Sequence, residues 1–172
     1  MNENWVENAS VGLRKKLPFF VSVLLVLCAH LPFNFLFLKN LHPALSAICV
    51  YFWLQHRPDL FNLWSVFGLG LIEGFLSTAP LGITIFELLL LYTLVNVSSR
   101  ILNAKPFVVL WYGFMVLFLI SVLAKWLLLS VYYSEFLPLF VLFFSYLVTI
   151  AVYPLVSLLL AFVQNRLMRD DS

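Results

Sequence analysis

Long, uninterrupted runs of apolar residues dominate the chain, and short polar or charged breaks separate them. The runs are continuous rather than alternating, which indicates helices instead of a barrel, the only two structures that satisfy the backbone in lipid. We therefore expect an all-α polytopic membrane protein that folds as a compact six-helix transmembrane bundle. Within a single transmembrane domain of residues 1–172, the expected spans are 17–37, 41–54, 60–76, 81–97, 106–129 and 136–163.

The composition excludes several classes of protein. Hydrophobic residues make up 63% of the chain and charged residues only 10%, with a mean hydropathy of +1.03. A soluble domain of this size would need far more polar surface than this. The net charge is +2, and no basic stripe is interleaved with polar residues, so we expect no binding to nucleic acid.

The positions of the basic residues predict the orientation in the membrane. The run that follows Arg14-Lys15-Lys16 is longer than the core of a signal peptide, so we interpret it as a retained first span. Because basic residues concentrate in cytoplasmic segments, we expect both termini to be cytoplasmic. The expected outer segments carry only Lys39, whereas the expected inner segments carry Arg14, Lys15, Lys16, Arg57, Arg100, Lys105, Arg166 and Arg169.

Two of the expected spans, 41–54 and 60–76, are short. A helix needs about 20 residues to cross the hydrocarbon core. These segments either cross where the membrane is thin or form a re-entrant hairpin. We favour full crossing, because the charged His56-Arg57-Pro58-Asp59 turn between them prefers an aqueous interface.

Three charged residues fall within the expected spans: Glu73, Glu87 and Lys125. All three are expected at similar depth in the outer half of the bilayer. A lone charge at mid-bilayer costs about 2.5–3.5 kcal/mol, and pairing or protonation relieves that cost. We expect an intramembrane polar cluster. It could clamp the helices together, handle a ligand or a proton, or contact a helix of a partner protein.

Two further features are candidate contacts with a partner. Gly70 and Gly74, spaced as Gly-x-x-x-Gly, place two small residues on one helix face, where another helix can approach closely. Arg57 and Asp59 flank Pro58 in the turn between the short spans. They either anchor that hairpin by their charge or contact a partner.

No enzymatic signature is present. The chain has no Gly-x-Ser-x-Gly, His-Glu-x-x-His or Walker motif, so we expect no catalytic residues and no enzyme activity. Cys28 and Cys49 fall in apolar runs and behave as small hydrophobic residues. The three histidines, His30, His42 and His56, have no metal-ligand spacing, so we expect neither a metal nor a cofactor.

One stretch, from Pro43 to Gly82, resembles the MreD family of bacterial rod shape-determining membrane proteins. Its Arg-Pro-Asp form is most similar to members from alphaproteobacteria. The family often has aspartate where this chain has Glu73. The residues that carry the resemblance are Pro43, Tyr51-Phe52-Trp53, Arg57-Pro58-Asp59-Leu60, Gly68-Leu69-Gly70-Leu71-Ile72-Glu73-Gly74 and Pro80-Leu81-Gly82.

The resemblance implies a non-enzymatic protein of the bacterial inner membrane. Such proteins work in the elongation machinery for peptidoglycan, beside MreC, RodA, an elongation-class penicillin-binding protein and the MreB filament. Their fold is thought to be similar to the substrate-binding subunits of energy-coupling vitamin transporters.

Two hypotheses of function follow. The first is a scaffold or regulator of cell-wall elongation that acts through helix contacts, with Arg57, Asp59, Gly70, Glu73 and Gly74 as candidate contacts. The second is the substrate-binding subunit of an importer for a vitamin or another small solute, with Glu73, Glu87 and Lys125 in its site. The short outer loops argue against the second, so we expect no small-molecule ligand.

Overall fold

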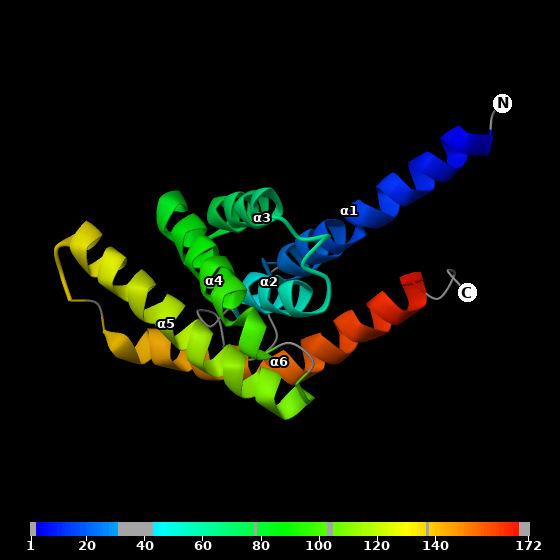
Figure 1. Ribbon diagram of the computed structural model, residues 1–172. Helices are drawn as coiled ribbons and strands as arrows, with labels where there is room; N and C mark the ends of the chain where they lie inside the picture. The colour runs from blue at the N-terminus through cyan, green and yellow to red at the C-terminus, as the bar shows by residue number, and fades with distance from the viewer. Residues whose placement is uncertain (1–2, 31–42, 78, 103–104, 137, 169–172) are drawn as a thin grey trace.

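The computed structural model describes residues 3–30, 43–77, 79–102, 105–136 and 138–168. In Figure 1, α2 lies near the centre, α5 and α6 run beside each other, and the first residues of α1 and the last of α6 point to the same side. The described residues form six α-helices, namely α1 (Glu3–His30), α2 (Leu45–His56), α3 (Leu63–Leu76), α4 (Leu81–Leu102), α5 (Phe107–Tyr133) and α6 (Leu139–Met168).

Three of these helices are long and apolar enough to cross a membrane. They cover Leu81–Ser99 in α4, Phe107–Tyr133 in α5 and Leu139–Arg166 in α6. The all-helical class is therefore confirmed, together with three helices of membrane-spanning length. Residues 31–37 of the first expected span and 41–42 of the second lie outside the described residues.

Proline and polar residues set the helix boundaries. Pro106 precedes α5 and accepts a backbone hydrogen bond from Val109, which suits a residue with no N–H of its own at a helix start. The same helix ends at Tyr133, and the following residue, Ser134, has a left-handed φ of 53° that stops the helical path. Pro58 and Pro80 lie in the breaks on either side of α3.

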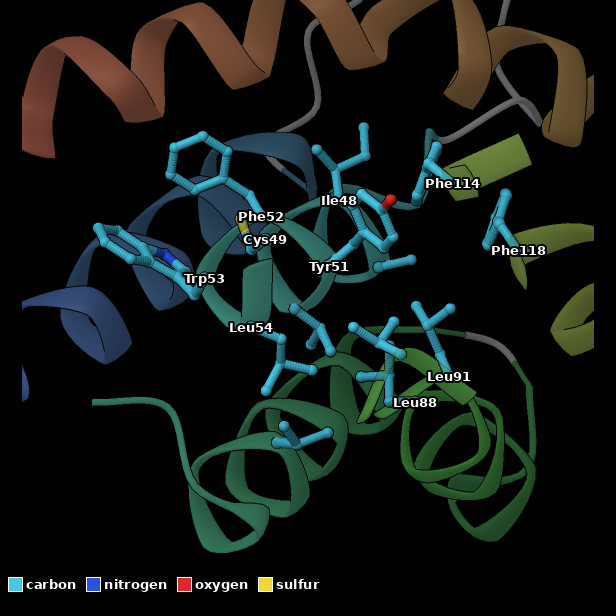
Figure 2. Packing of buried hydrophobic residues seen from close by; sticks show 14 of the residues in the cluster. Ile48, Cys49, Tyr51, Phe52, Trp53, Leu54, Leu88, Leu91, Phe114 and Phe118 are labelled. Carbon is cyan, nitrogen blue, oxygen red and sulfur yellow. The ribbon is translucent and has the colours of Figure 1, made fainter. Parts of the chain in front are cut away.

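The helix α2 forms the centre of the core. Every residue from Ser46 to Leu54 is buried, so this helix has protein on all of its sides rather than on one stripe. Figure 2 shows its side chains meeting those of α4 and α5. Aromatic rings fill the space toward α5 and α6, where Phe114 stacks on Tyr153 at 4.6 Å between ring centroids.

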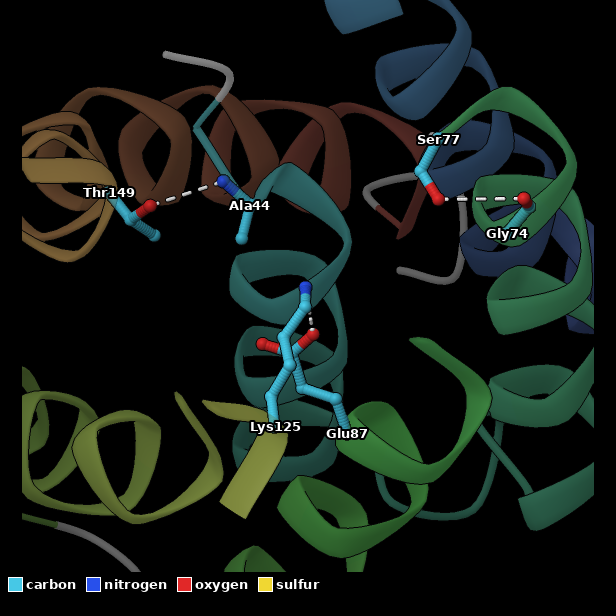
Figure 3. Close-up of polar contacts among 6 residues, drawn as sticks. All are labelled: Ala44, Gly74, Ser77, Glu87, Lys125 and Thr149. Atoms are coloured by element: carbon cyan, nitrogen blue, oxygen red, sulfur yellow. Dashed lines mark hydrogen bonds and ion pairs between the residues drawn. The ribbon is translucent and has the colours of Figure 1, made fainter. Parts of the chain in front are cut away.

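Hydrogen bonds join α2 to its neighbours just before its first residue and near its middle. Near its beginning, the Ala44 backbone N–H donates to Thr149 Oγ1 of α6 at 3.1 Å (Figure 3). Farther along, the Tyr51 hydroxyl donates to the Leu110 carbonyl of α5 at 2.7 Å. These two bonds hold α2 in one position against α5 and α6, and each end of α2 borders a cavity.

Candidate functional site

An ion pair between α4 and α5 is the first feature of the site. Lys125 Nζ donates to Glu87 Oε2 at 2.6 Å (Figure 3). The Glu87 side chain is only 7% exposed and that of Lys125 is 23% exposed. Each charge thus has its opposite within hydrogen-bond distance, which offsets much of the cost of removing both from water.

Glu73 of α3 lies in the same cavity as this pair. Its half-buried carboxylate interacts electrostatically with Glu87, Lys125 and His30. The three charged residues that were predicted within the spans therefore share one site, although they come from three different helices. Two carboxylates face one ammonium group, so the cluster has an excess of acidic groups.

The cavity around this cluster has a volume of about 560 Å³. Small-molecule sites occupy about 300–1,000 Å³, so the space is sufficient for a small solute. Part of the cavity wall is apolar and includes Phe118, Val122 and Leu142. Its polar lining residues beyond the three charged ones are His30, Ser77, Ser145 and Tyr146.

All six helices or the residues that flank them line this cavity. The lining comes from the ends of α1 and α3, the starts of α2, α4 and α6, and the second half of α5. The cavity therefore gathers residues from helices that lie far apart in the chain. Sequence reasoning missed His30, Ser77, Ser145 and Tyr146 as site residues. The signal that could have found His30, Ser145 and Tyr146 is that each is a polar side chain within an expected span.

Hydrogen bonds to backbone carbonyls hold three of these additional residues, and one of these bonds runs from Ser77 Oγ to the Gly74 carbonyl at 3.4 Å (Figure 3). His30 Nδ1 lies 2.9 Å from the Val26 carbonyl oxygen, and because a carbonyl only accepts, Nδ1 is the donor in this contact. The Tyr146 hydroxyl donates to the Met115 carbonyl at 2.9 Å, which ties α6 to α5 beside the cluster. The cavity therefore has a fixed wall on this side.

Gly70 and Gly74 of α3 lie against α4. A Cβ atom on Gly70 would be 3.2 Å from Ile85 Cα, and one on Gly74 would be 2.9 Å from Leu81 Cδ2. Both glycines are buried. The face that we proposed for a partner is covered by a helix of the same chain.

Arg57 and Asp59 follow the last residue of α2, whereas the charged cavity borders the residue before its first. Both are exposed in the turn between α2 and α3. The backbone of this turn is ordered by bonds from Arg57 N–H to the Trp53 carbonyl at 2.7 Å and from Leu60 N–H to the Arg57 carbonyl at 3.1 Å. The candidate residues therefore divide into a cavity cluster, an internal glycine contact and an exposed turn.

Within the described ranges, no group of three or more His, Cys, Asp and Glu side chains is arranged to hold a metal ion. The ionic cluster consists of two carboxylates and an ammonium, and an ammonium group is not a metal ligand. The arrangement is suited to holding charge between helices or to contacting a polar solute.

Fold and site together define an all-helical protein with three helices of membrane-spanning length and a charged cavity at one end. No family model, no curated protein and no solved structure matches the chain. The family resemblance therefore rests on the residues between Pro43 and Gly82 alone.

Proposed function

We propose that this protein is a non-enzymatic inner-membrane component of the bacterial cell-elongation machinery, of the MreD type. It helps to maintain cell shape by scaffolding or regulating peptidoglycan synthesis through helix contacts. In this proposal the chain crosses the membrane six times with both termini in the cytoplasm. MreC is its direct partner, and RodA, an elongation-class penicillin-binding protein and MreB belong to the same complex.

The outward face of α3 is the observation that carries this proposal. Trp64 is 81% exposed and Phe75 is 73% exposed, and Phe67 is exposed between them. The three rings follow the spacing i, i+3 and i+11, which places them on one stripe of the helix. An aromatic stripe of this kind suits docking of an apolar helix.

The length of α3 strengthens the argument. With 14 residues it is about 21 Å long, whereas the hydrocarbon core is about 30 Å thick. A short helix that faces lipid forces the bilayer to thin around it, and association with another helix relieves that mismatch. The helix α2 is shorter still, but it is enclosed by its own chain and faces no lipid.

The residues that carry the resemblance to the MreD family fall into a buried group and an exposed group. Tyr51, Phe52 and Trp53 are buried in the core, so they support the fold. Arg57 and Asp59 are exposed beside the first turn of α3. In this proposal, the turn contacts the cytoplasmic end of the partner whose membrane helix lies along the α3 stripe.

Affinity purification from native membranes in mild detergent tests the proposal. The tagged chain is compared with a variant that carries Trp64→Ala and Phe75→Ala, and co-purifying proteins are identified by mass spectrometry. We expect the wild-type chain to recover an MreC-like protein and the variant to lose it, with loss of rod shape in cells.

A second double variant, Phe140→Ala with Phe143→Ala, is the matched control, because it removes two exposed rings from α6 instead. Equal recovery of the partner by the α3 variant and the wild type would contradict the proposal. Equal loss in the α3 and α6 variants would contradict it as well, because the effect would then not belong to α3.

The cavity favours a second candidate function, the substrate-binding subunit of a small-solute or vitamin importer. Its volume of about 560 Å³ and its converging polar groups are the features that such a site needs. Organic extraction of the purified protein followed by mass spectrometry separates the two functions. Transport would be established if the wild type retains a solute that the Glu73→Gln variant does not, and if energy-coupling ATPases co-purify. It would be excluded if the extract holds no solute and the MreC-like partner co-purifies instead.

A further inference from the structure

A second pocket lies at the opposite end of α2 from the charged cavity. Ala44, just before α2, borders the charged cavity, whereas His56, the last residue of α2, borders this second pocket. Its volume is about 230 Å³. This is below the range of about 300–1,000 Å³ for sites that enclose a whole small molecule. The pocket can therefore hold one end of a ligand whose remainder lies outside.

The walls of this pocket are aromatic and aliphatic. Phe52 of α2 stacks on His56 with ring centroids 4.1 Å apart. Phe107 of α5 stacks on Tyr153 of α6 at 6.1 Å. Between these ring pairs, Leu110, Leu158, Ala161 and one polar residue, Ser157, complete the surface. A wall of this composition suits hydrocarbon rather than a freely soluble ion.

Two basic side chains border the pocket. Lys105 and His56 both line it and both are exposed to the surroundings. Among the described residues that line the pocket, none is a carboxylate. An ammonium group and an imidazole beside one opening attract a phosphate, which an ammonium binds through charge-assisted hydrogen bonds.

The depth of Lys105 matches that of a lipid head group. Lys105 is separated only by Pro106 from the 27-residue apolar helix α5. A lysine at this point lies where a membrane-spanning segment meets water. Basic pockets between membrane helices are a known form of recognition for anionic lipids.

We propose that this pocket binds one anionic phospholipid. The phosphate lies between Lys105 and His56, and the first part of an acyl chain lies along the walls formed by Phe52, Phe107 and Leu158. The site is separate from the α3 stripe and from the charged cavity. Its loss is therefore distinguishable from failure of the proposed partner contact.

Lipid retention by the full-length protein tests this proposal. The protein is purified in mild detergent, incubated with mixed micelles of phosphatidylglycerol and phosphatidylcholine, re-isolated, and its bound lipids are quantified by mass spectrometry. We expect the wild-type protein to retain phosphatidylglycerol in preference to phosphatidylcholine. The double variant Lys105→Ala with His56→Ala should retain at least about fivefold less phosphatidylglycerol, because charge-assisted bonds to the phosphate are lost. Lys16→Ala is the matched control, because Lys16 is an exposed lysine that does not line the pocket.

A pocket-filling variant tests the apolar part without changing charge. We expect Ala161→Leu to reduce the retained phosphatidylglycerol while the thermal unfolding midpoint of the lipid-free protein stays close to that of the wild type. Equal losses in the Lys16→Ala control would overturn the proposal, because the lipid would then follow overall charge. Thermal stabilisation by glycerol 3-phosphate equal to that by phosphatidylglycerol would also overturn it, because the apolar wall would then contribute nothing.

Discussion

Lys125 of α5 and Glu87 of α4 form an ion pair at 2.6 Å in the same cavity as the carboxylate of Glu73. The pair lies between two helices that are both long enough to cross a membrane. It links them beside the cavity that is lined by all six helices or by the residues that flank them. Four predictions follow from this contact and from the other interhelical contacts.

Removing one partner of the ion pair should destabilise the protein more than removing both. Glu87→Gln leaves the Lys125 ammonium without its closest partner. We expect a loss of about 1–3 kcal/mol, below the usual 3–5 kcal/mol for buried pairs because Lys125 is partly exposed. Glu87→Gln combined with Lys125→Met should recover most of this loss. Reversible unfolding in detergent micelles measures all three variants, and additive effects of the two substitutions would contradict direct pairing.

The close approach of α3 to α4 predicts a position-dependent response to alanine. A Cβ on Gly70 would meet the Ile85 backbone at 3.2 Å, which cannot move aside without shifting a helix. We expect Gly70→Ala to cost about 1–3 kcal/mol through overpacking. At Gly74 the nearest atom is the end of a leucine side chain, so the cost there should be smaller.

Gly82→Ala is the control for this series, since a Cβ there would meet nothing within 4 Å. As a residue of α4, it should gain about 0.5–1 kcal/mol from the better helix propensity of alanine. Thermal unfolding of the three variants gives the order. If Gly70→Ala were as stable as Gly82→Ala, the α3–α4 packing described here would be wrong.

The hydrogen bond from Tyr51 to the Leu110 carbonyl should contribute measurably to stability. Tyr51→Phe removes the hydroxyl and leaves the ring in the core. We expect a loss of about 0.5–1.5 kcal/mol, the usual net value of one such bond. Tyr112→Phe removes an exposed hydroxyl from the same helix that accepts the bond, and it should change stability by less than about 0.5 kcal/mol. Chemical denaturation of both variants checks the difference.

Thr149 should contribute more to the stability of the protein than a threonine whose hydroxyl bonds only within its own helix. Its oxygen accepts the Ala44 N–H at 3.1 Å and holds the start of α2 against α6. Thr149→Val keeps the shape but leaves that N–H without its acceptor, which costs about 1–3 kcal/mol. Thr93→Val is the matched control, because the exposed Thr93 hydroxyl bonds only within its own helix, to the Leu89 carbonyl. Unfolding midpoints that fall equally in both variants would refute the role of the α2–α6 bond.

The linear pattern of residues was sufficient to predict where the three helices of membrane-spanning length lie, but it did not predict that α1 begins at Glu3 instead of near Leu17. The expected segments 81–97, 106–129 and 136–163 correspond to α4, α5 and α6, whose first residues are 81, 107 and 139. This works because a continuous apolar run specifies a helix and its approximate length without reference to any neighbour. The same reasoning singled out the three charged residues of the cavity, since a charge inside an apolar run is costly wherever the run lies.

Pairing and packing required the tertiary structure. The sequence contains two glutamates at similar expected depth, and only the placement of α4 beside α5 selects Glu87 as the direct partner of Lys125. Likewise, Gly-x-x-x-Gly predicts close helix contact but not which helix makes it; here α4 of the same chain does. The polar residues His30, Ser145 and Tyr146 reach the cavity from α1 and α6 for the same reason.

Length, apolar continuity and the presence of buried charge are properties of each segment by itself, so the amino-acid order was enough to determine the helical class and the residues that need a partner. The identity of each partner depends on which helix faces join. That choice follows from packing among side chains far apart in the chain, centred on the fully buried α2. The charged cavity, the covered glycine face and the aromatic stripe of α3 were therefore decided by the three-dimensional arrangement.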